Sequence, residues 1–128
     1  MTVERRTASG LYPPPDYAHV SIGSGRIVHT AGAVPLDADG RLVGEGDIVA
    51  QAGWTIVNLL AQLGEAGATA RDVAKTTVYV VGDRAALGAV WGVVRTSPLR
   101  GAPSTLVGVS VLGYPGQRVE IEAVAVLD

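Results

Sequence analysis

Three charged side chains alternate with apolar ones close to the end of the sequence. In the segment RVEIEAVAV, Arg118, Glu120 and Glu122 occupy every second position, so in a strand they project from one face. A carboxylate in such a row can orient water or act as a general acid or base where a partner surface desolvates it. The spacing alone favours a plainer interpretation, a solvated or salt-bridged row. Both interpretations stay open at this point.

Other motifs that carry chemistry are missing from the sequence. His19 and His29 are accompanied by no cysteine and no HExxH spacing, which gives no support to a metal site. No Walker or Rossmann glycine pattern and no GxSxG elbow is present. A formal net charge of -2, with 2 Trp, 4 Tyr and no Phe, argues against nucleic acid and anionic lipid as partners. We therefore expect no metal, no cofactor and no nucleic-acid partner.

Length and composition point to one domain that assembles with copies of itself. The 128 residues fit a single domain over 1–128. Only 17% of the residues are charged and 48% are hydrophobic, whereas about 25% are charged in ordinary soluble domains. We expect part of the surface to be buried in a homo-oligomer, the alternative being a chain rich in small residues. No signal peptide and no membrane span is evident, which predicts a soluble, cytoplasmic protein.

Hydrophobic periodicity predicts six strands and two helices. Asp47 and Asp83 are the predicted N-caps of two amphipathic helices, which end at Gly64 and before Pro98. Alternation, β-branched residues and turn residues predict strands at residues 1–9, in both arms of a hairpin over 19–31, and at 73–81, 104–112 and 117–127, with a brief addition at 41–43.

The predicted order β-β-β-α-β-α-β-β describes an α+β fold. Two helices can cover only one face of a five- or six-stranded sheet. The segment 73–81 has few polar residues after Thr77, which indicates a strand buried on both faces. The sheet face without helices therefore requires a partner.

Six segments of the sequence together resemble the Rid family, also called the YjgF or liver perchloric-acid-soluble protein family. They are PPPDYAHV, IVHTAGAVPLD, the helix that begins at Asp47, DVAKTTVYV, APSTLVGV and VEIEAVAV. The resemblance implies a chorismate-mutase-like fold, with a mixed five- to six-stranded sheet and two helices on one face. It implies a homotrimer whose sheets form an inner barrel, with a small-molecule metabolite bound in each intersubunit cleft. The best-known members hydrolyse enamines and imines to 2-keto acids and ammonia.

The resemblance also assigns positions in the cleft. Tyr17 matches a tyrosine that borders the ligand, and Glu120 matches the acid that holds the attacking water. Gly32 matches the glycine of a strand-end pair, in which Ala31 replaces the common serine. Thr105 stands where the family has a Cys or Thr whose backbone meets the ligand. Each of these residues could also serve packing alone.

Two further positions depart from the pattern of the imine deaminases. Pro103 occupies the place of the arginine that grips the substrate carboxylate, and proline offers no donor for that contact. Trp91 stands where many deaminases have an asparagine, although a role in packing is favoured. Arg118 or Arg100 could supply a replacement cation, but pairing of Arg118 with a neighbouring glutamate is the favoured interpretation.

Two functions of different class follow from these positions. The first is hydrolysis of an imine, enamine or related C–N compound, with Pro103 shifting specificity towards bulkier or uncharged substrates. The alternative is a trimer without catalysis that binds a ligand or regulates another protein. The ribonuclease activity attributed to some relatives comes third, because the chain is acidic and has no histidine pair suited to cleaving RNA.

Overall fold

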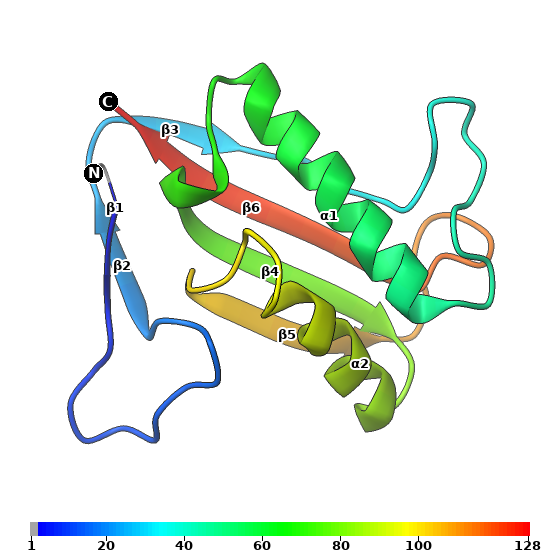
Figure 1. The fold of residues 1–128 in the computed structure, drawn as a ribbon, viewed down its shortest axis with the longest axis horizontal. Helices are drawn as coiled ribbons and strands as arrows, with labels where there is room; N and C mark the ends of the chain where they lie inside the picture. The colour runs from blue at the N-terminus through cyan, green and yellow to red at the C-terminus, as the bar shows by residue number, and fades with distance from the viewer. Residues whose placement is uncertain (1–2) are drawn as a thin grey trace.

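A computed structural model describes residues 3–128 and contains the predicted order of elements (Figure 1). Residues 1–2, part of the first predicted strand, lie outside the described residues. The elements are β1 (Val3–Arg6), β2 (Val20–Gly23), β3 (Arg26–His29), α1 (Ile48–Glu65), the 3-10 helix η1 (Ala70–Asp72), β4 (Val73–Val81), α2 (Arg84–Val94), β5 (Ser104–Val109) and β6 (Val119–Leu127).

The six strands form two sheets, whereas the sequence predicted one. A mixed four-stranded sheet has the order β3-β6-β4-β5, in which β4 and β5 are parallel and the other pairs antiparallel. β1 and β2 form a separate antiparallel pair at one end of the molecule (Figure 1). The α+β class, with two helices and mixed sheets, is confirmed, but the single five- to six-stranded sheet is corrected to four strands plus two.

The hairpin predicted over residues 19–31 is wrong. β2 pairs with β1, and β3 pairs with β6, so the two arms belong to different sheets. The long strand β6 offers β3 a ladder that continues past its end, where Thr30 donates its backbone N–H to Ala123. Gly25, at a φ of +135°, passes so close to the Leu127 carbonyl that a side chain would overlap it. The brief strand at 41–43 is reduced to one bridge between Leu36 and Leu42.

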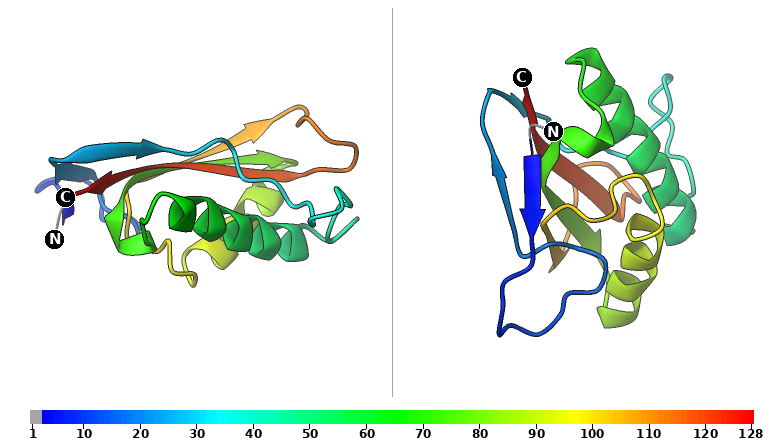
Figure 2. Two further views of the ribbon diagram at one scale, coloured as in Figure 1. Left: turned by 90° about the horizontal axis from the view of Figure 1, so that it is seen from above. Right: turned by 60° about the vertical axis from the view of Figure 1, so that its left-hand side comes forward.

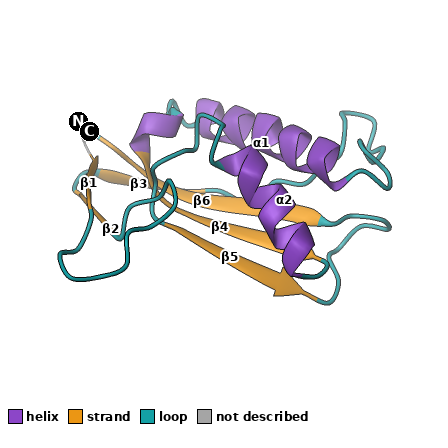
Figure 3. Ribbon diagram, turned by 60° about the horizontal axis from the view of Figure 1, so that its bottom comes forward, coloured by secondary structure: helices purple, strands orange, loops and turns teal. Residues whose placement is uncertain are grey.

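Both helices begin where the sequence predicted. The Asp47 carboxylate accepts a hydrogen bond of 3.0 Å from the Ala50 N–H, and the Asp83 carboxylate accepts one of 3.0 Å from Ala86. Seen edge-on, α1 and α2 lie together on one side of the four-stranded sheet (Figures 2 and 3). No helix within residues 3–128 has the length and apolar character needed to cross a membrane.

The core fills the space between the helices and the sheet. The buried side chains that define it come from alternate positions of the strands and from one stripe of each helix: Ala52, Leu59, Leu63, Val78, Val80, Val90, Val94, Val119 and Ile121. The opposite side of the sheet, here called the open face, carries the side chains that alternate with these: Lys75, Thr77, Tyr79, Thr105, Glu120 and Glu122. The strand 73–81 is thus buried on one face only within the chain.

Candidate functional site

The Glu120 carboxylate lies against Gly32 on the open face. The segment that follows β3 runs beside β6, because Ala33 and Ile121 exchange backbone hydrogen bonds of 2.7 and 3.2 Å. A Cβ atom on Gly32 would overlap the Glu120 side chain, so glycine alone leaves the carboxylate this position. The structure therefore brings these two predicted site residues together.

Gln117 holds the other side of the same carboxylate. Gln117 is 4% exposed, and its side-chain amide donates to Glu120 Oε1 at 3.1 Å and to the Val119 carbonyl at 3.0 Å. Its carbonyl oxygen accepts from the Tyr114 N–H at 3.1 Å, which ties it to the loop before β6. Glu120 is thus fixed in orientation by a neutral donor. Sequence reasoning missed Gln117, and its place three residues before Glu120 was the only signal.

Glu122 has a different partner. Its carboxylate accepts a hydrogen bond from the Tyr79 hydroxyl on the neighbouring strand. This hydrogen bond, then burial and the charges of Glu122 and Glu120, raises the pKa of Tyr79 above its ordinary value of 10.0. The two glutamates of β6 therefore have different hydrogen-bond donors: the Tyr79 phenol for Glu122 and the Gln117 amide for Glu120. Within residues 3–128, neither forms an ion pair with Arg118.

Tyr17 and Trp91 meet in an aromatic cluster on the other side of the sheet. Their ring centroids are 5.9 Å apart with the planes at 80°, an edge-to-face contact. The Trp91 indole N–H donates to the Pro15 carbonyl at 3.1 Å, which fixes the proline loop over α2. A cavity of about 280 Å³ opens beside them, lined by Pro15, Tyr17, Trp91, Ser104 and Leu106.

Asp16 positions the loop that carries Tyr17. It adopts a φ of +65°, a conformation that costs energy for a residue other than glycine. Its carboxylate is 2.7 Å from Arg95 Nε and 3.5 Å from Arg100 Nη2. Arg100, one of the two predicted replacement cations, is therefore paired with Asp16.

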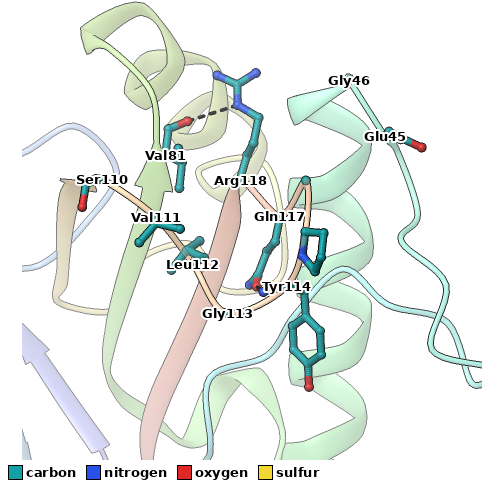
Figure 4. Close-up of a pocket in the computed structure, with 12 residues that line it drawn as sticks. Glu45, Gly46, Val81, Ser110, Val111, Leu112, Gly113, Tyr114, Gln117 and Arg118 are labelled. Carbon is teal, nitrogen blue, oxygen red and sulfur yellow. Dashed lines mark hydrogen bonds between the residues drawn. The ribbon is translucent and has the colours of Figure 1, made fainter.

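Arg118, the other predicted replacement cation, lines a separate cavity of about 700 Å³ at the far end of β4 (Figure 4). Loop 110–117 forms most of this cavity, together with Glu45, Gly46 and Val81. The Arg118 Nε–H donates to the Val81 carbonyl at 3.1 Å. The guanidinium thereby lies beside the end of β4, whereas the carboxylate of Glu120 is held by Gln117.

Pro103 and Thr105 lie at the start of β5. Pro103 is buried, and its carbonyl accepts the Thr76 N–H at 3.0 Å. Thr105 is exposed, and its hydroxyl accepts a hydrogen bond of 2.6 Å from the Lys75 ammonium. Sequence reasoning also missed Lys75, which stands inside a β-branched run.

The predicted residues fall into two groups on opposite sides of the sheet. Ser104 and Leu106, which line the cavity of Tyr17 and Trp91, lie opposite Thr76 and Val78, whose side chains point towards the helices. Glu120 and Thr105 lie on the open face. The carbonyl of exposed Ala31 accepts a hydrogen bond from Gln62 of α1. Among residues 3–128, Glu120, Thr105 and Ala31 are thus outside the lining of the cavity beside Tyr17 and Trp91.

The chain is similar to proteins of a known family. A family model described as Endoribonuclease L-PSP matches residues 7–127. The crystal structure of YyfB, a conserved Rid family protein from Yersinia pestis, superimposes with a TM-score of 0.92 at 34% identity, covering 99% of this chain and 100% of that one. The chain belongs to the Rid family. Protein DfrA of Myxococcus xanthus is 34% identical over 110 residues, 84% of this Rid chain and 81% of that protein.

Another relative covers more of the chain. The RutC family protein slr0709 of Synechocystis is 35% identical over 129 residues, which is 95% of this Rid chain and 94% of that protein.

Among residues 3–128, the site of this Rid chain combines three groups: the Glu120 carboxylate held by Gln117, the Lys75 ammonium without an ion-pair partner, and the cavity of Tyr17 and Trp91. Such a set can orient water, attract an anion and pack a flat or apolar group.

Proposed function

We propose that this Rid chain hydrolyses an imine, enamine or related C–N compound in a cleft between two copies of the chain. The observation that carries the proposal is the Glu120 carboxylate, which is held by Gln117 on Oε1 and lies against Gly32. A carboxylate fixed in this way, on a face that remains half-exposed, is suited to orient a water molecule and take its proton.

In the proposed reaction, the oxygen of this water bonds to the carbon of the C=N group. Glu120 takes one proton from the water and returns it to the nitrogen as that nitrogen becomes an amine. The C–N bond then breaks as the carbonyl forms, and the remaining hydroxyl proton passes through Glu120 to the departing nitrogen. One water and one unsubstituted imine thus give one carbonyl compound and one ammonia. An enamine enters the same path as its imine tautomer. No redox partner is required.

The separation of the two groups of residues supports a cleft shared by two chains. The cavity of Tyr17 and Trp91 and the Glu120 carboxylate lie on opposite sides of the sheet, so a small molecule cannot contact both in one chain. A second copy that presents its cavity edge to the open face would complete the set. In this arrangement Tyr17 and Trp91 pack the substrate, and the backbone at Ala31, Gly32 and Thr105 positions it. The homotrimer implied by the family resemblance would provide such contacts.

Binding without catalysis is the second candidate, and the burial of Pro103 favours it. In the place where imine deaminases have an arginine, Pro103 offers no side-chain donor, and its carbonyl is already used by Thr76. A trimer of this kind would bind a ligand or another protein. It would keep its affinity for that ligand in a Glu120→Gln variant, whereas an enzyme would lose turnover.

The test measures release of keto acid and ammonia from 2-aminoacrylate generated in situ and from a bulkier imine. We expect Glu120→Gln to lower turnover about 100-fold or more, because general base catalysis contributes that much. Pro103→Arg should raise turnover of 2-aminoacrylate, since it restores a bidentate donor. Equal turnover in wild type and Glu120→Gln would overturn the role proposed for Glu120. No turnover with any imine in either protein would overturn hydrolysis in favour of binding.

A mixing experiment tests whether the cleft is shared. Glu120→Gln and Trp91→Ala chains are prepared separately, unfolded together and refolded. If the carboxylate and the aromatic cavity come from different copies, some mixed oligomers contain a cleft with both wild-type groups, and activity returns. If one chain supplies both groups, no mixture exceeds the sum of its two inactive parents, and the shared cleft is wrong.

A further inference from the structure

Lys75 is the only lysine of the sequence, and it lies on the open face. Its ammonium donates to the neutral Thr105 hydroxyl at 2.6 Å. In the part of the chain that the structure describes, no carboxylate oxygen lies within 4.0 Å of the Lys75 ammonium nitrogen, so Lys75 forms no ion pair there. An ammonium has three donors, of which Thr105 uses one. The half-buried charge therefore retains capacity for an anion.

The glutamates of the same face are occupied elsewhere. Glu122 accepts the Tyr79 hydroxyl, and Glu120 accepts the Gln117 amide. Neither therefore neutralises the Lys75 ammonium within the chain. The Thr105 hydroxyl, whose oxygen accepts from Lys75, keeps its own proton available as a donor. Lys75 and Thr105 thus present two kinds of donor, an ammonium and a hydroxyl, at one exposed point of β4 and β5.

The register of the parallel pair places this point beside Pro103. Thr76 pairs with Ser104, so one residue earlier on each strand Lys75 stands opposite Pro103. Neighbouring strands are about 4.8 Å apart. The Lys75 cation is therefore one strand away from Pro103, whose side chain offers no hydrogen-bond donor.

We propose that Lys75, assisted by Thr105, is the acid-group anchor of the cleft, so that its substrates are C–N compounds that carry a carboxylate. This inference rests on the proposed function and names its substrate class. It differs from the uncharged substrates that Pro103 alone suggested. A lysine ammonium is a compact charge, whereas an arginine guanidinium is planar and binds a carboxylate through two parallel hydrogen bonds. Lys75 therefore binds the carboxylate at one point and leaves the rest of the substrate free to rotate.

The anchor acts together with a carboxylate from another copy of the chain. The Lys75 ammonium reaches Thr105, which lies level with Glu122 two strands away. Two strand spacings are about 10 Å, and Glu120 lies two residues further along β6. A short imino acid cannot span that distance. The Lys75 anchor of one chain therefore serves the Glu120 carboxylate of a neighbouring chain.

Binding of two matched probes to the full chain tests the anchor. Pyruvate carries the carboxylate, and pyruvamide is its neutral counterpart; the dissociation constant of each is measured by NMR titration. We expect the wild type to bind pyruvate about tenfold or more tightly than pyruvamide, as a hydrogen-bonded charge pair allows. Lys75→Met should abolish this preference and Lys75→Arg should retain it. Arg84→Gln, the control, makes the same charge change at an exposed position of α2 and should also retain it.

Three results would overturn the anchor: equal binding of both probes by the wild type, a preference that survives Lys75→Met, or a preference lost in Arg118→Met instead. Glu120→Gln separates this proposal from the previous one. If Glu120→Gln binds pyruvate normally and lacks turnover, both proposals stand. If it keeps turnover while Lys75→Met loses the preference for pyruvate, the anchor stands and the proposed role of Glu120 fails.

Discussion

The two faces of the four-stranded sheet use the same strands for different purposes. On the face below the helices, β4 and β6 contribute Val78, Val80, Val119 and Ile121, each fully buried. On the open face the residues between them are polar and half-exposed, among them Glu120. A strand of period two can therefore build a closed core and a chemical surface at once.

This difference separates stability from function within single strands. Adjacent residues of β6 face opposite environments, so a change at one position should affect folding and a change at the next should affect chemistry. The open face also uses its polar groups in pairs, Lys75 with Thr105 and Tyr79 with Glu122. Such pairs preserve polar side chains on a face that an oligomer can cover.

The largest expected effect comes from Ile121→Ala. Ile121 is 0% exposed within the core, so the truncation leaves a cavity and should lower the free energy of unfolding by about 2–5 kcal/mol. Glu120→Gln, one residue away, keeps an acceptor for the Gln117 amide and should change stability by less than about 1 kcal/mol. Denaturant unfolding at one fixed protein concentration measures both, because assembly makes stability depend on concentration.

Assays of turnover on the same two proteins complete this comparison. Folded Ile121→Ala should keep most of its activity at low temperature, whereas Glu120→Gln should lose it. A Glu120→Gln protein as destabilised as Ile121→Ala would show that the open face contributes to folding as much as the core does. The distinction between the two faces would then fail.

The helices and the separation of the two faces could be predicted from the sequence. Asp47 and Asp83 are local signals, because a cap depends on residues within one turn. The partners of β2 and β3 could not be predicted, because β2 pairs with β1 and β3 pairs with β6 instead of with each other. Competition between local and distant partners is settled by tertiary packing, and Ser24-Gly25 marks a turn without deciding which strands pair across it.

The candidate site divides in the same way. The family resemblance named Gly32 and Glu120 separately as cleft residues, and the structure shows that they are in contact. Lys75 and Gln117 were missed because their partners are fixed by strand register and by the fold of loop 110–117. A lysine among β-branched residues has no periodicity that distinguishes an anchor from a solvated side chain.

Removal of the Gln117 amide should have an intermediate effect. Gln117→Met keeps the length of the side chain and removes the donor that holds Glu120 Oε1. Loss of one positioning hydrogen bond should lower kcat about tenfold, with KM little changed, because the carboxylate orients water rather than binding substrate. Steady-state kinetics on a turned-over imine measures both constants.

Pro115→Gly provides the matched control for the loop. It loosens the turn before β6 without removing a hydrogen bond to Glu120. Unchanged kcat in Pro115→Gly beside reduced kcat in Gln117→Met would assign the effect to the carboxylate. Equal losses in both variants would instead assign it to general disorder of the loop.

The smallest expected effect is a pH dependence of stability at Tyr79. The hydrogen bond to Glu122 raises the pKa of Tyr79 in the folded protein above its ordinary value of 10.0. A phenol with a raised pKa stabilises the fold fully below pH 10, and this contribution is lost as the pH rises through the folded pKa. Wild type should therefore lose stability more steeply above about pH 10 than Tyr79→Phe.

Denaturant midpoints of the two proteins between pH 8 and about 11 provide the measurement. Arginines and the other phenols are common to both proteins, so the difference between the two curves isolates Tyr79. Glu122→Gln should reduce the same difference, because the phenolate would no longer form beside a carboxylate. Parallel curves for wild type and Tyr79→Phe would mean that the Tyr79 hydroxyl is solvated, and that the open face holds Glu122 as freely as it holds any surface acid.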